Sequence, residues 1–251
     1  MCKAHFICRK ANFTAPRRTT CKGDPLLKDI VFLDIDNTLL DFHACAQASL
    51  IPAFESAGLA FLPEYIPTFH KVNDALWRQI EDGVLTREGL YAVRFFRLFE
   101  ALGLSGDGDA AEVNFRRALA ESAEPVAGAH ALLRHLYPRY TLCAASNSLH
   151  LQQVKRLSRA GMLPYFTHLF TSEMLGVAKP DPAFFEAAFR LLDNPPKETC
   201  ILIGDSLTAD IRGGAAAHIR TCWYNPGGRT EPLDCPPTYT VKTLAEIQKI
   251  L

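Results

Sequence analysis

The residues with the clearest chemical potential are two carboxylates, Asp34 and Asp36, that stand two positions apart directly after a short apolar run. In an extended chain, residues i and i+2 point the same way, so both acids can face one phosphate group. One carboxylate can then attack phosphorus while the other handles the proton of the leaving group. Such pairs also occur in surface turns, so the pair gains meaning only together with the rest of the chain.

Three further groups of polar residues follow later apolar runs. The Ser146-Asn147-Ser148 stretch combines hydroxyls with backbone N–H groups that can hold phosphate oxygens, although Ser and Asn are also ordinary helix caps. Lys179 stands in a stiff Lys-Pro-Asp-Pro turn, where it offers a cation. Asp205 and Asp210 are five residues apart, and acids at a strand end suit Mg²⁺, which prefers hard oxygen ligands.

Short apolar runs predict the strands that must position these residues. The expected strands are 30–34, 140–145, 166–171, 199–204, 220–224 and a weaker one at 239–241. Helix-like segments lie between or after them, at 149–160, 182–192, 207–218 and 244–251. This alternation predicts a Rossmann-like α/β fold, with a parallel sheet covered by helices. Ligands bind beyond the carboxyl ends of such strands, so Asp34, Ser146 and Asp205 should converge on one crevice.

The segment between the first two strands has no strand pattern, and it is too long for an ordinary crossover connection. It predicts helices at 43–57, 65–81, 86–102 and 108–122. We therefore expect an all-helical cap over residues 42–124, inserted into an α/β core formed by 29–41 and 125–251.

Composition excludes several classes of protein. The 251 residues hold 27 basic and 27 acidic side chains, and this balance argues against a partner that is a nucleic acid polymer. No uncharged apolar stretch is long enough to span a membrane. None of the eight cysteines forms a Cys-x-x-Cys pair, which is typical of a reduced, cytoplasmic protein without structural zinc. The sequence carries no signal for an oligomeric state.

Residues 1–28 differ from the rest of the chain because they hold seven basic side chains and one acid. We expect a disordered N-terminal extension, or a start codon placed too far upstream, that carries no chemistry. A basic, acid-poor composition is also typical of transit peptides, so organellar targeting is the less favoured alternative.

Taken together, these motifs resemble the four-part signature of the haloacid dehalogenase-like (HAD) hydrolases over about residues 29–251. The motifs are the Asp-x-Asp-x-Thr run, a serine at a strand end, Lys-Pro, and Gly-Asp-x-x-x-x-Asp. The resemblance implies that Asp34 is a nucleophile that forms an aspartyl-phosphate, and that Asp36 acts first as general acid and then as base. It also implies that Ser146 and Lys179 bind the phosphoryl group.

The same resemblance assigns supporting residues and a metal. Thr38 and Asn147 would support the phosphoryl site. Mg²⁺ would be held by the carboxylates of Asp34 and Asp205 and by the main-chain carbonyl of Asp36. Asp210 would support the loop that carries Asp205 without binding the metal directly.

One residue distinguishes branches of this superfamily. Its carbon–halogen lyases lack an acid at the position of Asp36, because a halide leaves without a proton and needs no Mg²⁺. A phosphate ester does need that proton, so the sequence predicts a phosphatase. A non-catalytic relative would be expected to have lost Asp34, Asp36 or Asp205, and all three are present.

A narrower resemblance, to house-cleaning pyrimidine 5′-nucleotidases, lies in the segments 72–77, 83–86, 94–100, 148–154, 176–180 and 221–225. It implies that pyrimidine nucleoside 5′-monophosphates are the substrates. Trp77 and Phe95 are then candidates to stack on a base, with Arg94 meeting its carbonyls. Aromatic residues at helical spacing also commonly form the small core of such a cap. A phosphoglycolate or sugar-phosphate phosphatase would share every core residue and differ only in the cap.

Overall fold

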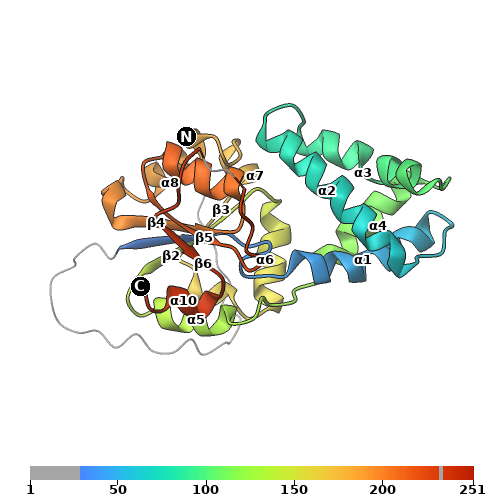
Figure 1. Cartoon of the computed structure of the whole chain (residues 1–251). Coiled ribbons are helices and arrows are strands. Elements are labelled where there is room, and N and C mark those ends of the chain that lie inside the picture. Colours follow the sequence, from blue (N-terminus) through green and yellow to red (C-terminus); the bar gives the residue numbers. More distant parts are fainter. Residues whose placement is uncertain (1–28, 232–233) are drawn as a thin grey trace, which may run out of the picture.

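The computed structural model describes residues 29–231 and 234–251, and its centre is one sheet of six parallel strands (Figure 1). The predictions made for residues 1–28 lie outside the described part. The strands are β1 (Ile30–Leu33), β2 (Thr141–Ser146), β3 (His168–Thr171), β4 (Cys200–Gly204), β5 (Arg220–Tyr224) and β6 (Tyr239–Val241). Their order across the sheet is β3-β2-β1-β4-β5-β6, so β1 lies at the centre between β2 and β4. This confirms the predicted parallel α/β fold.

Helices cover both faces of this sheet, as Figure 1 shows. One face packs against α5 (Ala129–Leu136), α6 (His150–Arg159) and α10 (Leu244–Ile247). The other face packs mainly against α8 (Pro182–Leu191), near the short helices α7 (Ser172–Leu175) and α9 (Gly213–Ala216). Strand β1 serves both layers, because its side chains alternate between the two faces. Val31 and Leu33 join one apolar core, and Ile30 and Phe32 join the other.

Four helices between β1 and β2 form a separate layer beside the sheet, at the right of Figure 1. They are α1 (Phe42–Ser56), α2 (Ile66–Glu81), α3 (Arg87–Leu102) and α4 (Gly108–Ala120), and we call residues Phe42–Ala120 the helical insert. Asp41, Thr86 and Asp107 cap the N-termini of α1, α3 and α4 by accepting a backbone N–H. The insert has its own apolar core, which includes Phe54, Phe69 and Phe115.

The two chain segments that join the insert to the sheet are bonded to each other. The Asp41 N–H donates to the Glu124 carbonyl at 2.8 Å, and the Val126 N–H donates to the Leu39 carbonyl at 2.9 Å. Leu40 and Pro125 also form an antiparallel bridge. The insert therefore enters and leaves the sheet region through one paired connection.

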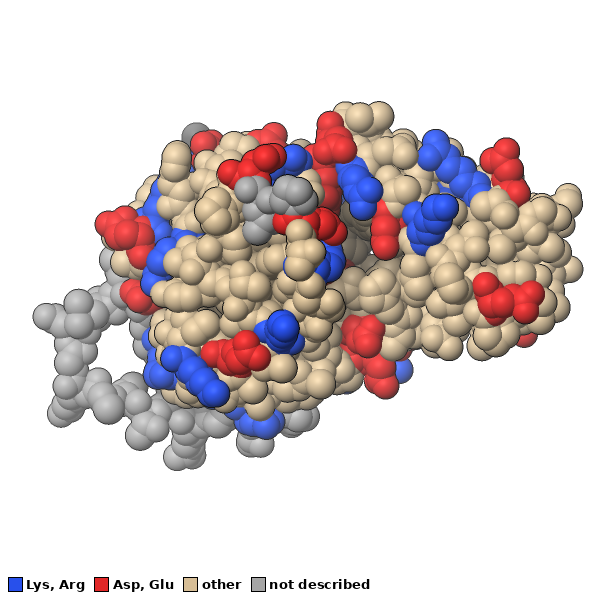
Figure 2. Space-filling view, viewed as in Figure 1, with Lys and Arg blue, Asp and Glu red and all other residues tan. Residues whose placement is uncertain are grey.

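The surface carries both signs of charge. On the face shown in Figure 2, acidic and basic side chains are interspersed over the sheet layer and the insert. Within the described ranges, every helix is too short or too polar to cross a lipid bilayer.

Candidate active site

The loop after β1 carries both acids of the Asp34–Asp36 pair. The Asp34 N–H still donates to Ile203 of β4 at 2.9 Å, so Asp34 is fixed at the edge of the sheet. The chain then turns through Asn37, which has a positive φ of 60°, a conformation that asparagine tolerates well. The Asn37 side chain accepts the N–H of Phe42 at 3.1 Å, which ties this turn to the start of α1.

Lys179 lies beside Asp34, and its ammonium group is buried with only 1% of the residue exposed. Its Nζ donates to Asp34 Oδ1 at 2.8 Å, to Asp210 Oδ1 at 2.6 Å and to the carbonyl of Ala145 at 2.7 Å. Burial alone would lower the pKa of Lys179, but the carboxylates of Asp210 and Asp34 outweigh burial and raise it above its ordinary range. Lys179 is therefore a permanent cation.

Asn147 lies beside Lys179 at the edge of the pocket. It lines the pocket, but its side-chain carbonyl accepts the N–H of Lys179 and its amide donates to the Lys179 carbonyl, both at 2.8 Å. Both ends of the amide are thus used by the backbone of the lysine. Asn147 therefore positions Lys179 through its backbone while it also lines the pocket.

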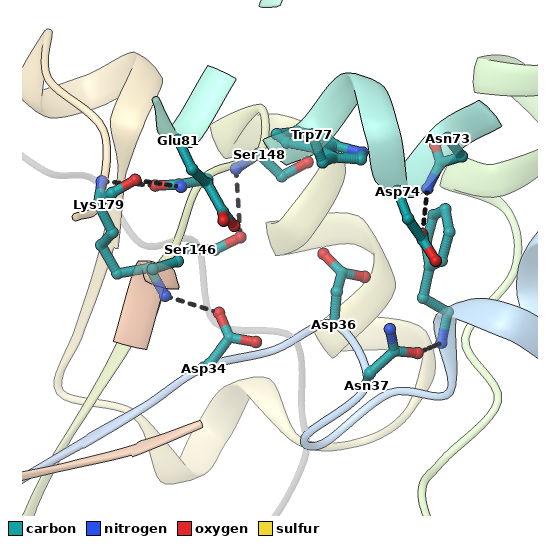
Figure 3. Close-up of a pocket in the computed structure, with 13 residues that line it drawn as sticks. Asp34, Asp36, Asn37, Asn73, Asp74, Trp77, Glu81, Ser146, Ser148 and Lys179 are labelled. Atoms are coloured by element: carbon teal, nitrogen blue, oxygen red, sulfur yellow. Dashed lines mark hydrogen bonds and ion pairs between the residues drawn. The ribbon is translucent and has the colours of Figure 1, made fainter. Parts of the chain in front are cut away.

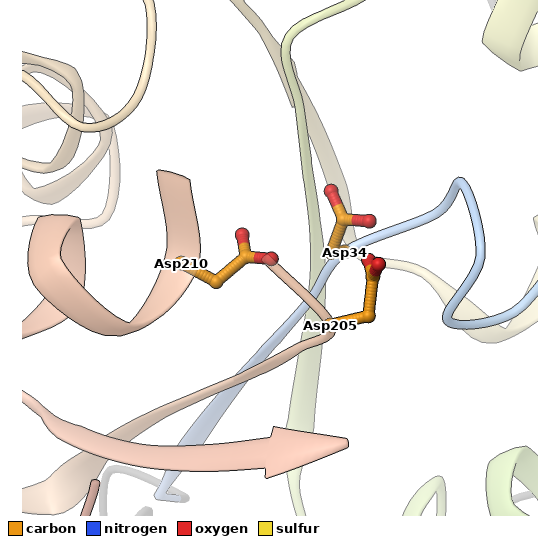
Figure 4. A group of neighbouring side chains, drawn as sticks. All are labelled: Asp34, Asp205 and Asp210. Atoms are coloured by element: carbon orange, nitrogen blue, oxygen red, sulfur yellow. The ribbon is translucent and has the colours of Figure 1, made fainter. Parts of the chain in front are cut away.

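Three carboxylates form one cluster at the ends of β1 and β4: Asp34, Asp205 and Asp210, drawn in Figure 4. One ligand atom from each lies within 4.8 Å of the others. Burial, and next the charge of Asp210, raises the pKa of Asp205 to about 7. Burial also raises the pKa of Asp34, and the pairing with Lys179 only partly opposes this.

The chemistry of this cluster fits a hard divalent cation. Three carboxylates gather around the buried ammonium of Lys179. Burial is the main cause that raises the pKa values of Asp34 and Asp205, and the charge of Asp210 adds to it. All the donors are oxygens, as Mg²⁺ requires. Asp210 faces Lys179 and also accepts the N–H of Ser206 at 3.0 Å, which suits a supporting position.

Ser146 lines the pocket, whereas Thr38 lies outside the lining and contacts Asp205. The Ser146 hydroxyl oxygen accepts the N–H of Ser148 at 3.2 Å and the Gln153 amide at 3.0 Å. Thr38 is fully buried, and its hydroxyl donates to Asp205 Oδ1 at 3.4 Å. The loops after β1, β2 and β4 therefore meet at one point, as the predicted topology requires.

A pocket of about 170 Å³ opens above these residues, between the sheet and helix α2 (Figure 3). Helix α2 contributes four residues to the lining, Asn73, Asp74, Trp77 and Glu81. Figure 3 shows the carboxylates of Asp74 and Glu81 pointing toward the sheet residues. Lys179 is the one cation among the described residues that line the pocket. The wall of the pocket that belongs to the insert is therefore polar and acidic, with two aromatic rings, those of Trp77 and Phe42.

Glu81 and Asp74 are site residues that the sequence analysis missed. Glu81 accepts a hydrogen bond from the Ser206 hydroxyl at 3.3 Å, so it bridges the insert and the sheet. Burial, and next the charge of Asp210, raises the pKa of Glu81 to about 7. Their helical spacing from Trp77, at i−3 and i+4, was the available signal, because it puts all three on one face of α2.

Asp36 has two further partners that the sequence analysis did not identify. Gln153 Nε2 donates to Asp36 Oδ2 at 2.6 Å, and Arg156 Nη1 donates to Asp36 Oδ1. Both partners lie on the buried face of α6, together with Leu157. Two polar residues on the apolar face of an amphipathic helix were the signal in the sequence.

The structure corrects two predicted substrate contacts. Phe95 is only 1% exposed and packs against Phe69, Phe99 and Phe115 inside the insert, because its side of α3 faces the neighbouring helices. Arg94 is only 2% exposed and donates two hydrogen bonds to Glu112, at 3.0 and 2.7 Å, and one to Asn73, at 3.1 Å.

Arg94 touches a second, smaller hollow of about 30 Å³ rather than the main pocket. Its charge is already balanced by Glu112, so the guanidinium holds α3 and α4 together. Of the three predicted cap contacts, Trp77 alone lines the main pocket.

This arrangement of a parallel sheet and a carboxylate–lysine site at its carboxyl edge agrees with comparisons to known proteins. The chain belongs to the family described as haloacid dehalogenase-like hydrolases, whose family model matches residues 28–218. It is therefore a hydrolytic enzyme.

Three individual relatives show which members of this family the chain is similar to. The chain is 37% identical to the pyrimidine 5′-nucleotidase PynA of Streptococcus pneumoniae, over 86% of this chain and 92% of that protein. It is 33% identical to the pyrimidine 5′-nucleotidase YjjG of Escherichia coli, over 89% of this chain and 97% of that protein. The solved structure of the HAD-hydrolase YfnB from Bacillus subtilis, bound to magnesium, superposes with a TM-score of 0.84 at 33% identity, covering 90% of this chain and 99% of that one.

Proposed function

We propose that this protein is a Mg²⁺-dependent phosphomonoesterase that acts through an aspartyl-phosphate, with pyrimidine nucleoside 5′-monophosphates as its substrates. The observation that carries the proposal is a nucleophile fixed by a buried cation. Asp34 is held at 2.8 Å by the ammonium of Lys179, at the floor of a pocket that Asp36 also lines. A nucleophile and a group that can act as acid and then as base are the minimum set for ester hydrolysis in two steps.

In the first step, a carboxylate oxygen of Asp34 attacks phosphorus, and the bond between phosphorus and the leaving oxygen breaks. Asp36 gives its proton to that oxygen, so the alcohol leaves neutral. Ser146 accepts two hydrogen bonds and can use its hydroxyl hydrogen to donate to a phosphate oxygen. Lys179 holds the orientation of Asp34 throughout.

In the second step, Asp36 takes a proton from water as the water oxygen attacks phosphorus. The bond between phosphorus and Asp34 breaks, and phosphate leaves with the original carboxylate restored. Mg²⁺, held by the carboxylates of Asp34 and Asp205 and the Asp36 carbonyl, would neutralise charge on the transferring group.

The pocket wall formed by α2 supports a leaving group without negative charge. A carboxylate or second phosphate on the leaving group would meet Asp74 and Glu81, with no cation among the described insert residues that line the pocket. Trp77 offers a flat surface on which a base can stack. A nucleoside is neutral and flat, whereas glycolate carries a charge. The similarity to two pyrimidine 5′-nucleotidases points the same way.

A panel of phosphate esters tests the proposal. UMP, dUMP and dTMP should exceed phosphoglycolate in kcat/KM by at least about tenfold, which needs only about 1.4 kcal/mol of differential transition-state binding. The assay is best run at pH 8, because the pKa of Glu81 is raised to about 7 and the side chain is then ionised. Phosphate release at saturating Mg²⁺ is the measurement.

The variant Glu81→Gln should narrow the gap between UMP and phosphoglycolate. Glu88→Gln is the matched control, because the Glu88 side chain is 75% exposed on α3 and outside the pocket. A hexose phosphate that is turned over faster than UMP would overturn the nucleotide assignment and leave the phosphatase assignment intact.

A further inference from the structure

Both carboxylate oxygens of Asp36 are held by side chains from one helix. Gln153 Nε2 donates to Oδ2 at 2.6 Å, and Arg156 Nη1 donates to Oδ1. The two donors also contact each other, since Arg156 Nη1 donates to Gln153 Oε1 at 3.2 Å. Asp36 is therefore part of a closed network of three residues.

This network is buried on its far side and open on the side of the pocket. Gln153 and Arg156 are fully buried, whereas 29% of the Asp36 side chain is exposed. Each carboxyl oxygen has two lone-pair directions, and the two donors occupy one on each oxygen. The remaining directions are free to carry or receive a proton at the pocket.

The network also connects two other parts of the site. Gln153 Nε2 donates to the Ser146 hydroxyl at 3.0 Å, so one amide contacts both Asp36 and the end of β2. Arg156 Nε donates to the carbonyl of Ser122 at 3.1 Å, in the segment that leads from α4 back to the sheet. These contacts fix the orientation of Asp36 relative to strand β2 and to the segment that joins the insert to the sheet.

We propose that Gln153 and Arg156 are positioning residues for Asp36 in proton transfer, an inference that rests on the proposed function. They fix the carboxyl group so that its free oxygen directions face the leaving oxygen. Neither touches the reacting atoms: Arg156 acts through Asp36, and Gln153 acts mainly through Asp36 while it also contacts Ser146. In the step they serve, the Asp34 oxygen bonds to phosphorus, the ester bond breaks, and the Asp36 proton moves to the leaving oxygen.

The dependence on leaving group separates this role from a structural one. Loss of Asp36 positioning should slow esters whose alkoxide must be protonated, such as UMP. It should hardly slow p-nitrophenyl phosphate, because p-nitrophenolate leaves without a proton. A damaged fold or metal site would slow both substrates alike. The parameter to compare is kcat/KM, since it reports the steps up to the first irreversible one and thus includes leaving-group departure.

The first test is Gln153→Met, which keeps the length of the side chain and removes its donor. We expect kcat/KM for UMP to fall at least about tenfold, within the range that general acid catalysis contributes, and kcat/KM for p-nitrophenyl phosphate to fall less than about threefold. Gln47→Met, an identical change at an exposed position on α1, should leave both values unchanged. Equal losses on the two substrates, or no loss on either, would overturn the inference.

A second test covers the case in which Gln153→Met folds poorly. Arg156→Lys keeps the buried positive charge but cannot contact Asp36, Gln153 and Ser122 at once, so it should show the same loss on UMP alone. In an Asp36→Ala background, adding Gln153→Met should lower UMP turnover no further, because the residues act as one unit. Additive losses there would contradict the inference.

The same data separate the inference from the proposed function. If the wild-type protein hydrolyses neither ester, the phosphatase proposal is wrong. If it hydrolyses both and Asp36→Ala slows UMP selectively while Gln153→Met and Arg156→Lys do not, only the positioning role is wrong.

Discussion

At the residue scale, Lys179 determines most of the charge balance of the site. All three hydrogens of its ammonium are used by Asp34, Asp210 and the Ala145 carbonyl. The lysine therefore acts on a bound phosphate mainly through its charge and through the orientation of Asp34. A substrate oxygen would have to share one of these hydrogens.

Replacing the nucleophile tests the centre of the mechanism. We expect Asp34→Asn to lower the rate of phosphate release at least about a thousandfold, because an amide is a poor nucleophile and a weak metal ligand. The fold should persist, since Asn has the same shape and removes one charge from a carboxylate cluster. Phosphate release at saturating Mg²⁺ and circular dichroism are the measurements. Normal release from this variant would exclude the covalent mechanism.

Residues fixed by local motifs could be predicted from the sequence, and residues fixed by tertiary contacts could not. Asp34, Ser146 and Asp205 each follow an apolar strand, so the topology alone predicts that they meet. Glu81 and Arg156 come from helices whose rotation about their axes depends on packing against neighbours. For the same reason, the sequence left Phe95 as a candidate for either a substrate contact or the core of the cap, and packing in the insert buries it.

At the scale of elements, the segment after β4 differs from the helix that the sequence predicts. The predicted helix at 207–218 is in fact a π-helical turn, Leu207–Arg212, followed by α9. A π-turn widens the helix, and such turns are frequent at functional sites. The periodicity of the sequence could not reveal this, because it predicts that a segment is helical but not whether its hydrogen bonds are those of an α-helix or a π-helix. The long helices of the insert match the predicted ranges to within about two residues, since amphipathic patterns define α2, α3 and α4 and a mostly apolar run defines α1.

The glycine that ends β4 should be required for this geometry. A Cβ at Gly204 would lie 2.2 Å from Oδ2 of Asp210, so Gly204→Ala must push Asp210 away from Lys179. We expect a loss of about 1–3 kcal/mol in the free energy of unfolding and a marked loss of activity. Gly227→Ala is the control, because nothing lies within 4 Å of its Cβ position. Chemical denaturation compares the two, and equal stability would show that Asp210 relocates freely.

At the scale of the whole molecule, metal binding and protonation should compete for the same cluster. An Asp in the unfolded chain ionises near pH 4, whereas the pKa of Asp205 is about 7 in the metal-free fold. Between these values the folded state holds more protons than the unfolded state. The stability of the metal-free protein therefore falls as the pH rises through this window.

Mg²⁺ should reverse this trend, because it binds the ionised carboxylates. We expect the difference in melting temperature between Mg²⁺ and EDTA to be larger at pH 8 than at pH 6, measured by differential scanning fluorimetry. Asp205→Asn should greatly reduce the Mg²⁺ effect and remove part of the pH dependence, to which the raised pKa values of Asp34 and Glu81 also contribute. A difference that stays constant with pH would argue that the cluster does not bind the metal.

The paired connection between sheet and insert also has an evolutionary consequence. Because the backbone of Asp41 is bonded to that of Glu124, the two ends of the insert are neighbours. A segment of different length or sequence can begin and end there without altering the strands, as insertions succeed where chain ends lie close together. Natural selection can then remodel the wall that faces the leaving group while the phosphoryl-transfer residues, all outside this segment, are inherited unchanged. Proteins with this connection can therefore acquire new substrates while they keep the same phosphoryl-transfer reaction.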